Sequence, residues 1–210
     1  MRNYKQIDQY LDMLEEDVYP QPQDEGHTLL ANRSIGWLST HLPPALTVLD
    51  VGAGEGFCQD IFLAYGYSYA GISLGEDCVV AKANGKNVHP MDFNFLTLED
   101  ETIDLVYSRH SLEHSFSPLI SLLEWRRVSR KYLAVILPAP EHYKPGGRNH
   151  PFVLYREQWL ALFEIAGWKI EQAYMELGLD KEIWEYWYIC SKTDRPDYSP
   201  PPPEVEDEEN

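Results

Sequence analysis

The sequence predicts a three-layer α/β sandwich built on a mostly parallel, seven-stranded sheet with an antiparallel hairpin at its C-terminal end. Two observations support this prediction. Strand patterns and helix patterns alternate from residue 46 to residue 166, which is typical of parallel strands joined by helical crossovers. The last two strand patterns, Trp168–Met175 and Ile183–Cys190, follow each other without a helix between them, so we expect them to pair antiparallel at one edge.

The individual elements are predicted from apolar periodicity and from the residues that interrupt it. Apolar residues recur at helical spacing over residues 3–18, which predicts an amphipathic helix that ends before Pro20. A second helix is expected over residues 28–40, before Pro43. The remaining strands are expected at Leu46–Val51, Tyr67–Ile72, Asn87–Pro90, Ile103–Tyr107 and Tyr132–Leu137. The remaining helices are expected at Phe57–Tyr65, Glu76–Ala83, Pro118–Val128 and Arg156–Ala166.

The composition changes along the chain and divides it into three parts. We expect residues 1–44 to form an N-terminal helical cap and residues 45–193 to form one α/β domain. Residues 194–210 contain four consecutive prolines, Pro200–Pro203, followed by an acidic run. Such a composition cannot build a core, so we expect a disordered tail.

Acidic residues outnumber basic residues by 34 to 17 among the 210 residues, which gives a formal net charge of −17. Such a surface repels phosphate groups, which argues against nucleic acid and anionic membranes as partners. No apolar run approaches the length of a membrane span. The three cysteines include no Cys-x-x-Cys pair, which favours free thiols in a reducing compartment. We therefore expect a soluble, cytoplasmic protein.

The most informative stretch of the chain is Val48–Gly56. An apolar strand contains Asp50 near its end and passes through three alternating glycines into a helical pattern. Glycines allow a sharp turn and let a ligand approach the backbone, and the helix behind them presents unpaired N–H groups. The spacing is Gly-x-Gly-x-Gly rather than the Gly-x-Gly-x-x-Gly of dinucleotide sites, and Asp50 would repel a pyrophosphate. The acid suits a ligand with an ammonium or sulfonium charge; the alternative is an ordinary tight turn.

From Thr47 to about Glu171 the chain resembles the class I S-adenosylmethionine-dependent methyltransferases of the type-11 and type-23 group, whose fold is Rossmann-like. The segments that carry the resemblance occur in the family's order and spacing, and they are Val48–Gly56, Gly71–Leu74, Met91–Phe93, Thr102–Ser108, His110–His114 and Phe152–Trp168. The occurrence of all these segments together indicates this family much more specifically than any one of them does.

The resemblance implies that S-adenosylmethionine is the cofactor and that residues 45–193 bind it. The implied cofactor-binding residues are Asp50, Gly52, Ala53, Gly54, Ser73, Leu74, Asp92, Phe93 and Ser108. The glycine turn would pass under the methionine part, and Asp50 would face the amino-acid end directly or through water. Asp92 would accept a hydrogen bond from the adenine amino group, Phe93 would flank the ring, and Ser108 would lie near the sulfonium. All these positions follow or end parallel strands, where open α/β sheets bind ligands.

Ser73 departs from the family pattern. The family usually has an acid there that grips both ribose hydroxyls, whereas a hydroxyl can make only one such bond. Relatives in the cyclopropane-fatty-acid synthase branch have Gly-Val-Thr-Leu-Ser at this site, which is similar to Gly71–Gly75. Two outcomes stay open: Glu76 or Asp77 supplies the missing carboxylate, or the cofactor site is weakened or lost.

His110, Glu113 and His114 form a second constellation, and on a helical turn the two histidines would share one face. Three interpretations stay open: a histidine takes a proton from the acceptor, the three residues bind a divalent metal as in a few related methyltransferases, or the segment only shapes the pocket. His110 and His114 are therefore the candidate catalytic residues. His110 stands where the metal-binding relatives have an acid, so no metal site is predicted.

The loop from Pro138 to Pro151 is long for a compact domain, which favours a lid or a binding loop over a solvated surface loop. Its Arg148 could clamp an acidic group on the acceptor. His27 and Trp37, in the N-terminal helices, are further candidate acceptor contacts.

The expected function is methyl transfer from S-adenosylmethionine to an oxygen or nitrogen of a small molecule. The alternative is a non-catalytic member of the family that binds the cofactor or serves as a structural subunit, and Ser73 is its main support. A third hypothesis is a methyltransferase that acts on a protein or on a nucleic acid. The acidic composition disfavours a nucleic-acid acceptor. The sequence predicts no oligomeric state.

Overall fold

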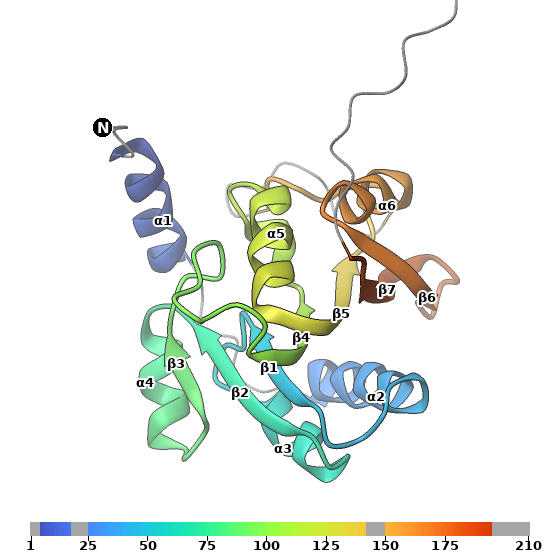
Figure 1. Ribbon diagram of the computed structural model, residues 1–210, viewed down its shortest axis with the longest axis horizontal. Helices are drawn as coiled ribbons and strands as arrows, with labels where there is room; N and C mark the ends of the chain where they lie inside the picture. Colours follow the sequence, from blue (N-terminus) through green and yellow to red (C-terminus); the bar gives the residue numbers. More distant parts are fainter. Residues whose placement is uncertain (1–4, 18–24, 142–149, 195–210) are drawn as a thin grey trace, which may run out of the picture.

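The computed structural model describes residues 5–17, 25–141 and 150–194, which form helices on both faces of one sheet (Figure 1). The strands are β1 (Thr47–Val51), β2 (Ser68–Ser73), β3 (Val88–Pro90), β4 (Ile103–Arg109), β5 (Ser129–Pro138), β6 (Trp168–Leu177) and β7 (Ile183–Lys192). The helices are α1 (Lys5–Asp17), α2 (Glu25–His41), α3 (Cys58–Ala64), α4 (Glu76–Ala83), the 3-10 helix η1 (Leu112–His114), α5 (Pro118–Val128) and α6 (Arg156–Ile165).

The sheet has seven strands in the order β3-β2-β1-β4-β5-β7-β6. The pairs from β3 through β5 are parallel, whereas β7 is antiparallel to both β5 and β6. The predicted three-layer fold with its antiparallel C-terminal hairpin is therefore confirmed. The order reverses between β1 and β4, and such a switch point opens a crevice at the carboxyl ends of the strands.

Two apolar cores hold the layers together. Fully buried residues of α2 and α3, such as Ile35 and Phe62, pack against one face of the sheet. Fully buried Trp125 of α5 and Phe163 of α6 pack against the other face, and Figure 1 shows these helices on opposite sides. Strands β1, β2, β4 and β5 contribute buried residues to both cores, which explains why these strands read as nearly continuous apolar runs.

Several element boundaries differ from the predicted ones. α2 begins at Glu25 rather than at residue 28, and β5 begins at Ser129, immediately after α5, rather than at Tyr132. α2 also packs on the sheet beside α3, because its apolar face carries Ile35 and Leu38. The predicted tail lies outside the described residues, apart from Asp194.

Among the described residues, no helix combines the length and the hydrophobicity that crossing a membrane requires. Cys58, Cys78 and Cys190 are all buried and form no disulfide with one another. Burial raises the pKa of the Cys58 and Cys190 thiols. These cysteines therefore behave as small apolar core residues.

Candidate functional site

The turn after β1 lies at the switch point and is bound to the neighbouring strand. Gly52 and Gly54 both have left-handed backbone angles, with φ of 75° and 53°. The backbone N–H groups of Gly52 and Ala53 donate to the same carbonyl oxygen, that of Ile72 at the end of β2, at 3.0 and 2.9 Å. These bonds fix the turn against the end of β2, where the ribose of a cofactor would lie according to the resemblance.

The glycines of the turn differ in what surrounds them. A Cβ atom at Gly52 would lie 2.1 Å from Ser111 Oγ, and one at Gly56 would lie 2.8 Å from a methyl group of Val88. At these two positions the absence of a side chain makes room for the protein itself. A Cβ atom at Gly54 would meet only Asp77 Oδ2, at 3.6 Å.

Asp77 is the acid that faces this turn. Its side chain is buried, whereas Glu76, the other candidate for the missing ribose acid, is exposed. Burial, together with the charge of Glu55, raises the pKa of Asp77 to about 6. Ser73 is also buried at the end of β2, and the half-buried Leu74 leads from it into α4. The structure thus brings Ser73, Leu74 and the carboxylate of Asp77 together beside Gly54.

Asp50 and Ser108 do not open onto solvent. Asp50 is 2% exposed and accepts a hydrogen bond of 2.8 Å from the hydroxyl of Tyr69. Burial raises the pKa of Asp50 to about 7, against the opposing effects of that hydrogen bond and of the Arg109 charge. The hydroxyl of Ser108 is fully buried and has no hydrogen-bond partner among the described residues. Contact of either side chain with a ligand would therefore require the ligand, or a water molecule, to enter the crevice.

The segment after β3 holds Asp92 and Phe93. One carboxylate oxygen of Asp92 accepts hydrogen bonds from the backbone and side-chain amides of Asn94, at 2.8 and 2.7 Å. The Asn94 side-chain oxygen in turn accepts bonds from the hydroxyls of Ser115 and Ser121, at 2.7 Å each. This network connects the Asp92 turn to the segment after β4 and to α5. The ring of Phe93 packs edge-on against Trp125 of α5.

His110 follows β4 in a left-handed conformation, with φ of 50°, and η1 begins only at Leu112. His110 and His114 therefore do not lie one turn apart on a single helix, which corrects the predicted local geometry. The Nε2 atom of His110 lies 2.8 Å from Glu185 Oε1. Glu185, on β7, also accepts hydrogen bonds from Arg109, at 2.9 Å, and from the indole of Trp187, at 2.8 Å.

Glu185 is ionised although it is buried. Burial opposes the charge, but the hydrogen bond from His110 and the charges of His110 and Arg109 outweigh it and lower the pKa of Glu185 to about 2. The sequence analysis missed this residue, because a glutamate in an aromatic strand carries no sign that it faces the end of β4.

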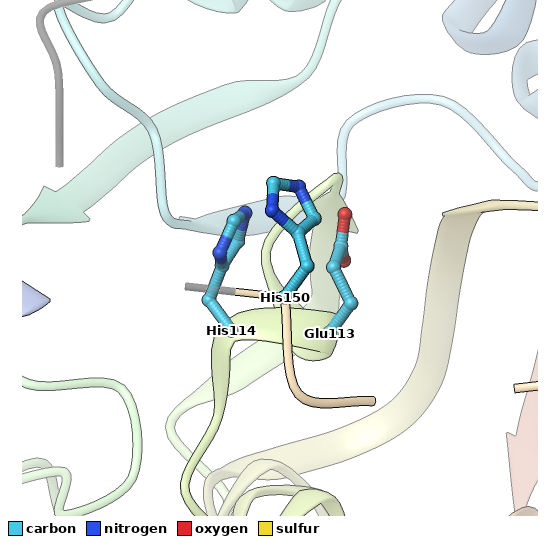
Figure 2. A group of neighbouring side chains, drawn as sticks. All are labelled: Glu113, His114 and His150. Atoms are coloured by element: carbon cyan, nitrogen blue, oxygen red, sulfur yellow. The ribbon is translucent and has the colours of Figure 1, made fainter. Parts of the chain in front are cut away.

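Glu113, His114 and His150 form a compact group (Figure 2). The first two come from η1 and the third from the segment before α6, and in Figure 2 all three side chains point the same way. The rings of His114 and His150 have centroids 4.3 Å apart. Glu113 is fully buried, and burial raises its pKa to about 8. Of the constellation His110, Glu113 and His114 that the sequence suggested, the structure groups Glu113 and His114 with His150.

The remaining candidates lie elsewhere or outside the described part of the chain. Trp37 packs against Trp187 and Tyr174, over β7 and β6. The side chain of His27 and the loop residues 142–149, with Arg148, lie outside the described residues.

The central part of the chain is similar to known methyltransferases. Residues 49–134 match the family model of a methyltransferase domain, whereas no curated protein matches the chain. An S-adenosylmethionine-dependent methyltransferase from Aquifex aeolicus has 22% identity and a TM-score of 0.62, over 82% of this chain and 100% of that one.

Two other solved structures are similar in fold. The 1,6-didemethyltoxoflavin-N1-methyltransferase from Burkholderia thailandensis, solved with its substrate and S-adenosylhomocysteine, has 18% identity and a TM-score of 0.67 over 92% of each chain. The [4+2]-cyclase SpnF has 13% identity and a TM-score of 0.67, over 90% of this chain and 93% of that one. Residues 49–134 therefore match a methyltransferase domain, and the chain has the same fold as the S-adenosylmethionine-dependent methyltransferase from Aquifex aeolicus.

Proposed function

We propose that this protein transfers the methyl group of S-adenosylmethionine to an oxygen or nitrogen atom of a small-molecule acceptor. The observation that carries the proposal is the buried carboxylate of Asp77 opposite Gly54 at the switch point of a methyltransferase domain. It offers the cofactor ribose the acid that Ser73 cannot supply. An intact nucleoside site argues against the alternative in which the cofactor site is weakened or lost.

The two ends of the cofactor would lie on different parts of the crevice. A ribose beside Gly54 could donate both hydroxyls to Asp77, whose raised pKa reflects a carboxylate in need of donors. The Asp92 carboxylate, held by Asn94, would accept from the adenine amino group. The carboxylate of Asp50 would stabilise the cationic amino-acid end, directly or through water.

The chemical step is a substitution at the methyl carbon. The acceptor lone pair forms a bond to the methyl carbon while the carbon–sulfur bond breaks, and the bonding electrons neutralise the sulfonium to give S-adenosylhomocysteine. The protein mainly has to align the acceptor with that carbon. When the acceptor is a hydroxyl its proton must also leave, and His110 is the base that we assign to take it.

The surroundings of His110 support this role. Glu185 accepts a hydrogen bond from Nε2, which selects the tautomer whose Nδ1 can take a proton, and the ionised Glu185 stabilises the imidazolium that results. The left-handed backbone of His110 costs on the order of 1–3 kcal/mol, and such strain is concentrated at functional sites. The acidic charge balance argues against nucleic acid as the acceptor.

The assignment of Asp77 is tested by titrating the protein with S-adenosylmethionine and S-adenosylhomocysteine in a calorimeter. Asp77→Asn keeps the shape of the side chain but removes its charge, so we expect the affinity for both ligands to fall at least about tenfold, or 1.4 kcal/mol. The exposed neighbour Glu76→Gln is the matched control and should bind like the wild type. Equal affinities for Asp77→Asn and wild type would reject the role given to Asp77.

The alternative function, a non-catalytic member of the family, is favoured by Ser73 alone. A protein that releases no heat with either ligand at millimolar concentration would be a structural subunit. One that binds both ligands but methylates none of a broad panel of hydroxylated and amine-containing metabolites would be a cofactor-binding protein. The fold does not by itself imply methyl transfer, since a cyclase shares it.

A further inference from the structure

We infer that Glu113, His114 and His150 bind one divalent transition-metal ion next to the proposed catalytic site. Glu113 is fully buried, and neither of its carboxylate oxygens has a hydrogen-bond partner among the described residues. A buried carboxylate without hydrogen bonds costs several kcal/mol unless a cation compensates for it. The nearest basic nitrogen of an ion pair is Nδ1 of His110, at 4.0 Å, too distant for a hydrogen bond.

The two imidazoles reach Glu113 from segments far apart in the sequence. His114 follows Glu113 in η1, whereas His150 comes from the segment before α6. The backbone N–H of Phe152 donates to the carbonyl oxygen of Glu113 at 3.3 Å, which ties that segment to η1. In Figure 2 the three side chains lie side by side and point the same way, and one ligand atom from each lies within 4.8 Å of the other two.

The spacing suits a metal ion after a modest adjustment. Three ligand atoms around one ion, each at about 2.1 Å from it, lie about 3.4–3.6 Å apart. A separation at the upper limit of 4.8 Å therefore requires side-chain movements of about 1 Å. Because His114 and His150 lie side by side with tilted rings, small rotations can direct a nitrogen of each toward the carboxylate.

The ligand types select the class of ion. Two imidazoles and one carboxylate suit Zn²⁺, Fe²⁺, Co²⁺ or Mn²⁺, whereas Mg²⁺ and Ca²⁺ prefer ligand sets made of oxygen. Three protein ligands leave at least one coordination position open. The position of His114 in this set also assigns the two predicted histidines different tasks, since His110 remains paired with Glu185.

The open position refines the substrate class, and this step rests on the proposed function. Glu113, one of the three proposed ligands, has Oε1 4.0 Å from Nδ1 of His110, so an acceptor oxygen bound to the ion would be close to the proposed base. A divalent ion lowers the pKa of a bound hydroxyl and fixes its position. The acceptor is then a hydroxyl compound rather than an amine, because an amine nitrogen bound to the ion has no lone pair left to attack the methyl carbon, whereas a bound oxygen keeps one.

The binding site is tested with untagged protein, freed of metal by a chelator and then titrated with Co²⁺, whose visible absorption reports nitrogen and oxygen ligation. We expect one Co²⁺ per chain, displaced by Zn²⁺ and unaffected by Mg²⁺ at the same concentration. His150→Ala should weaken Co²⁺ binding at least about tenfold, since even an indirect partner of a metal ligand contributes 10–100-fold. The exposed His89→Ala is the matched control and should bind Co²⁺ like the wild type.

Two results would overturn the inference: no Co²⁺ absorption with the wild type, or the same affinity in His150→Ala as in the wild type. Circular dichroism of His150→Ala excludes loss of folding as the cause of weaker binding. Should Glu113→Gln also fold, it should lose the Co²⁺ spectrum as well. The proposed function is judged separately, because the calorimetric affinity of His150→Ala for S-adenosylhomocysteine should stay within about twofold of the wild type.

Discussion

At the scale of single residues, Asp50 combines a place beside the cofactor turn with an environment that disfavours its charge. Burial raises its pKa to about 7, whereas in the unfolded chain it titrates near 3.8. The folded state therefore holds a proton that the unfolded state has lost between these two values. Asp50 therefore contributes to the free energy of unfolding below pH 4, where it is protonated in both states. This contribution to stability is lost as the pH rises through 7.

Asp50→Asn keeps an acceptor for the Tyr69 hydroxyl and removes the charge. We expect the variant to exceed the wild type in free energy of unfolding at pH 8 by about 2–4 kcal/mol, and the two to converge near pH 4. Denaturant unfolding at pH 4, 6 and 8 measures this. The exposed Asp8→Asn controls for the general loss of negative charge, and a gain of equal size in that variant would contradict the explanation.

Gly52 and Gly85 allow backbone strain to be separated from crowding. Both have φ above 70°, but a Cβ at Gly52 overlaps Ser111, whereas a Cβ at Gly85 meets nothing within 4 Å. Gly85→Ala should therefore cost about 1–2 kcal/mol of stability, and Gly52→Ala about 2–5 kcal/mol. Adding Ser111→Gly to Gly52→Ala should recover part of the difference in a thermal or urea melt. Equal losses at the two glycines would show that Ser111 does not restrict the turn.

At the scale of secondary-structure elements, the antiparallel hairpin of β6 and β7 completes one edge of the sheet and also supplies a residue to the proposed site. β7 lies beside β5, and its Glu185 reaches the end of β4, where it binds Arg109 and His110. Arg109 and Glu185 are both almost fully buried, with side-chain exposures of 6% and 2%. The hairpin thereby fixes the orientation of the base proposed for methyl transfer.

Removing one partner of a buried ion pair leaves the other charge uncompensated. Glu185→Ala should therefore lower the free energy of unfolding by about 3–5 kcal/mol, and the double variant Arg109→Met, Glu185→Leu should recover most of that loss. The exposed Glu182→Ala, on the hairpin turn, is the control and should change stability by less than about 0.5 kcal/mol. A double variant as unstable as Glu185→Ala would show that the residues contribute by packing and not by charge.

At the scale of the whole molecule, the elements of the parallel sheet were predictable because their signals are local. A buried parallel strand reads as an apolar run, and Val48–Gly56 combines such a run with glycines that a tight turn requires. The start of α2 at Glu25 was missed, because its first residues carry no apolar periodicity. The start of β5 at Ser129 was missed because α5 passes into the strand without a turn residue.

The sequence by itself determined the layered fold, the antiparallel hairpin and the resemblance to methyltransferases, since apolar periodicity and short motifs lie within contiguous segments. Only the tertiary structure decided that Asp77 rather than Glu76 faces Gly54, and that Glu185 holds His110. It alone placed His150 beside Glu113 and His114. The physical reason is that these contacts join residues on different strands and loops, and their distances depend on how the sheet is assembled, which no local pattern encodes.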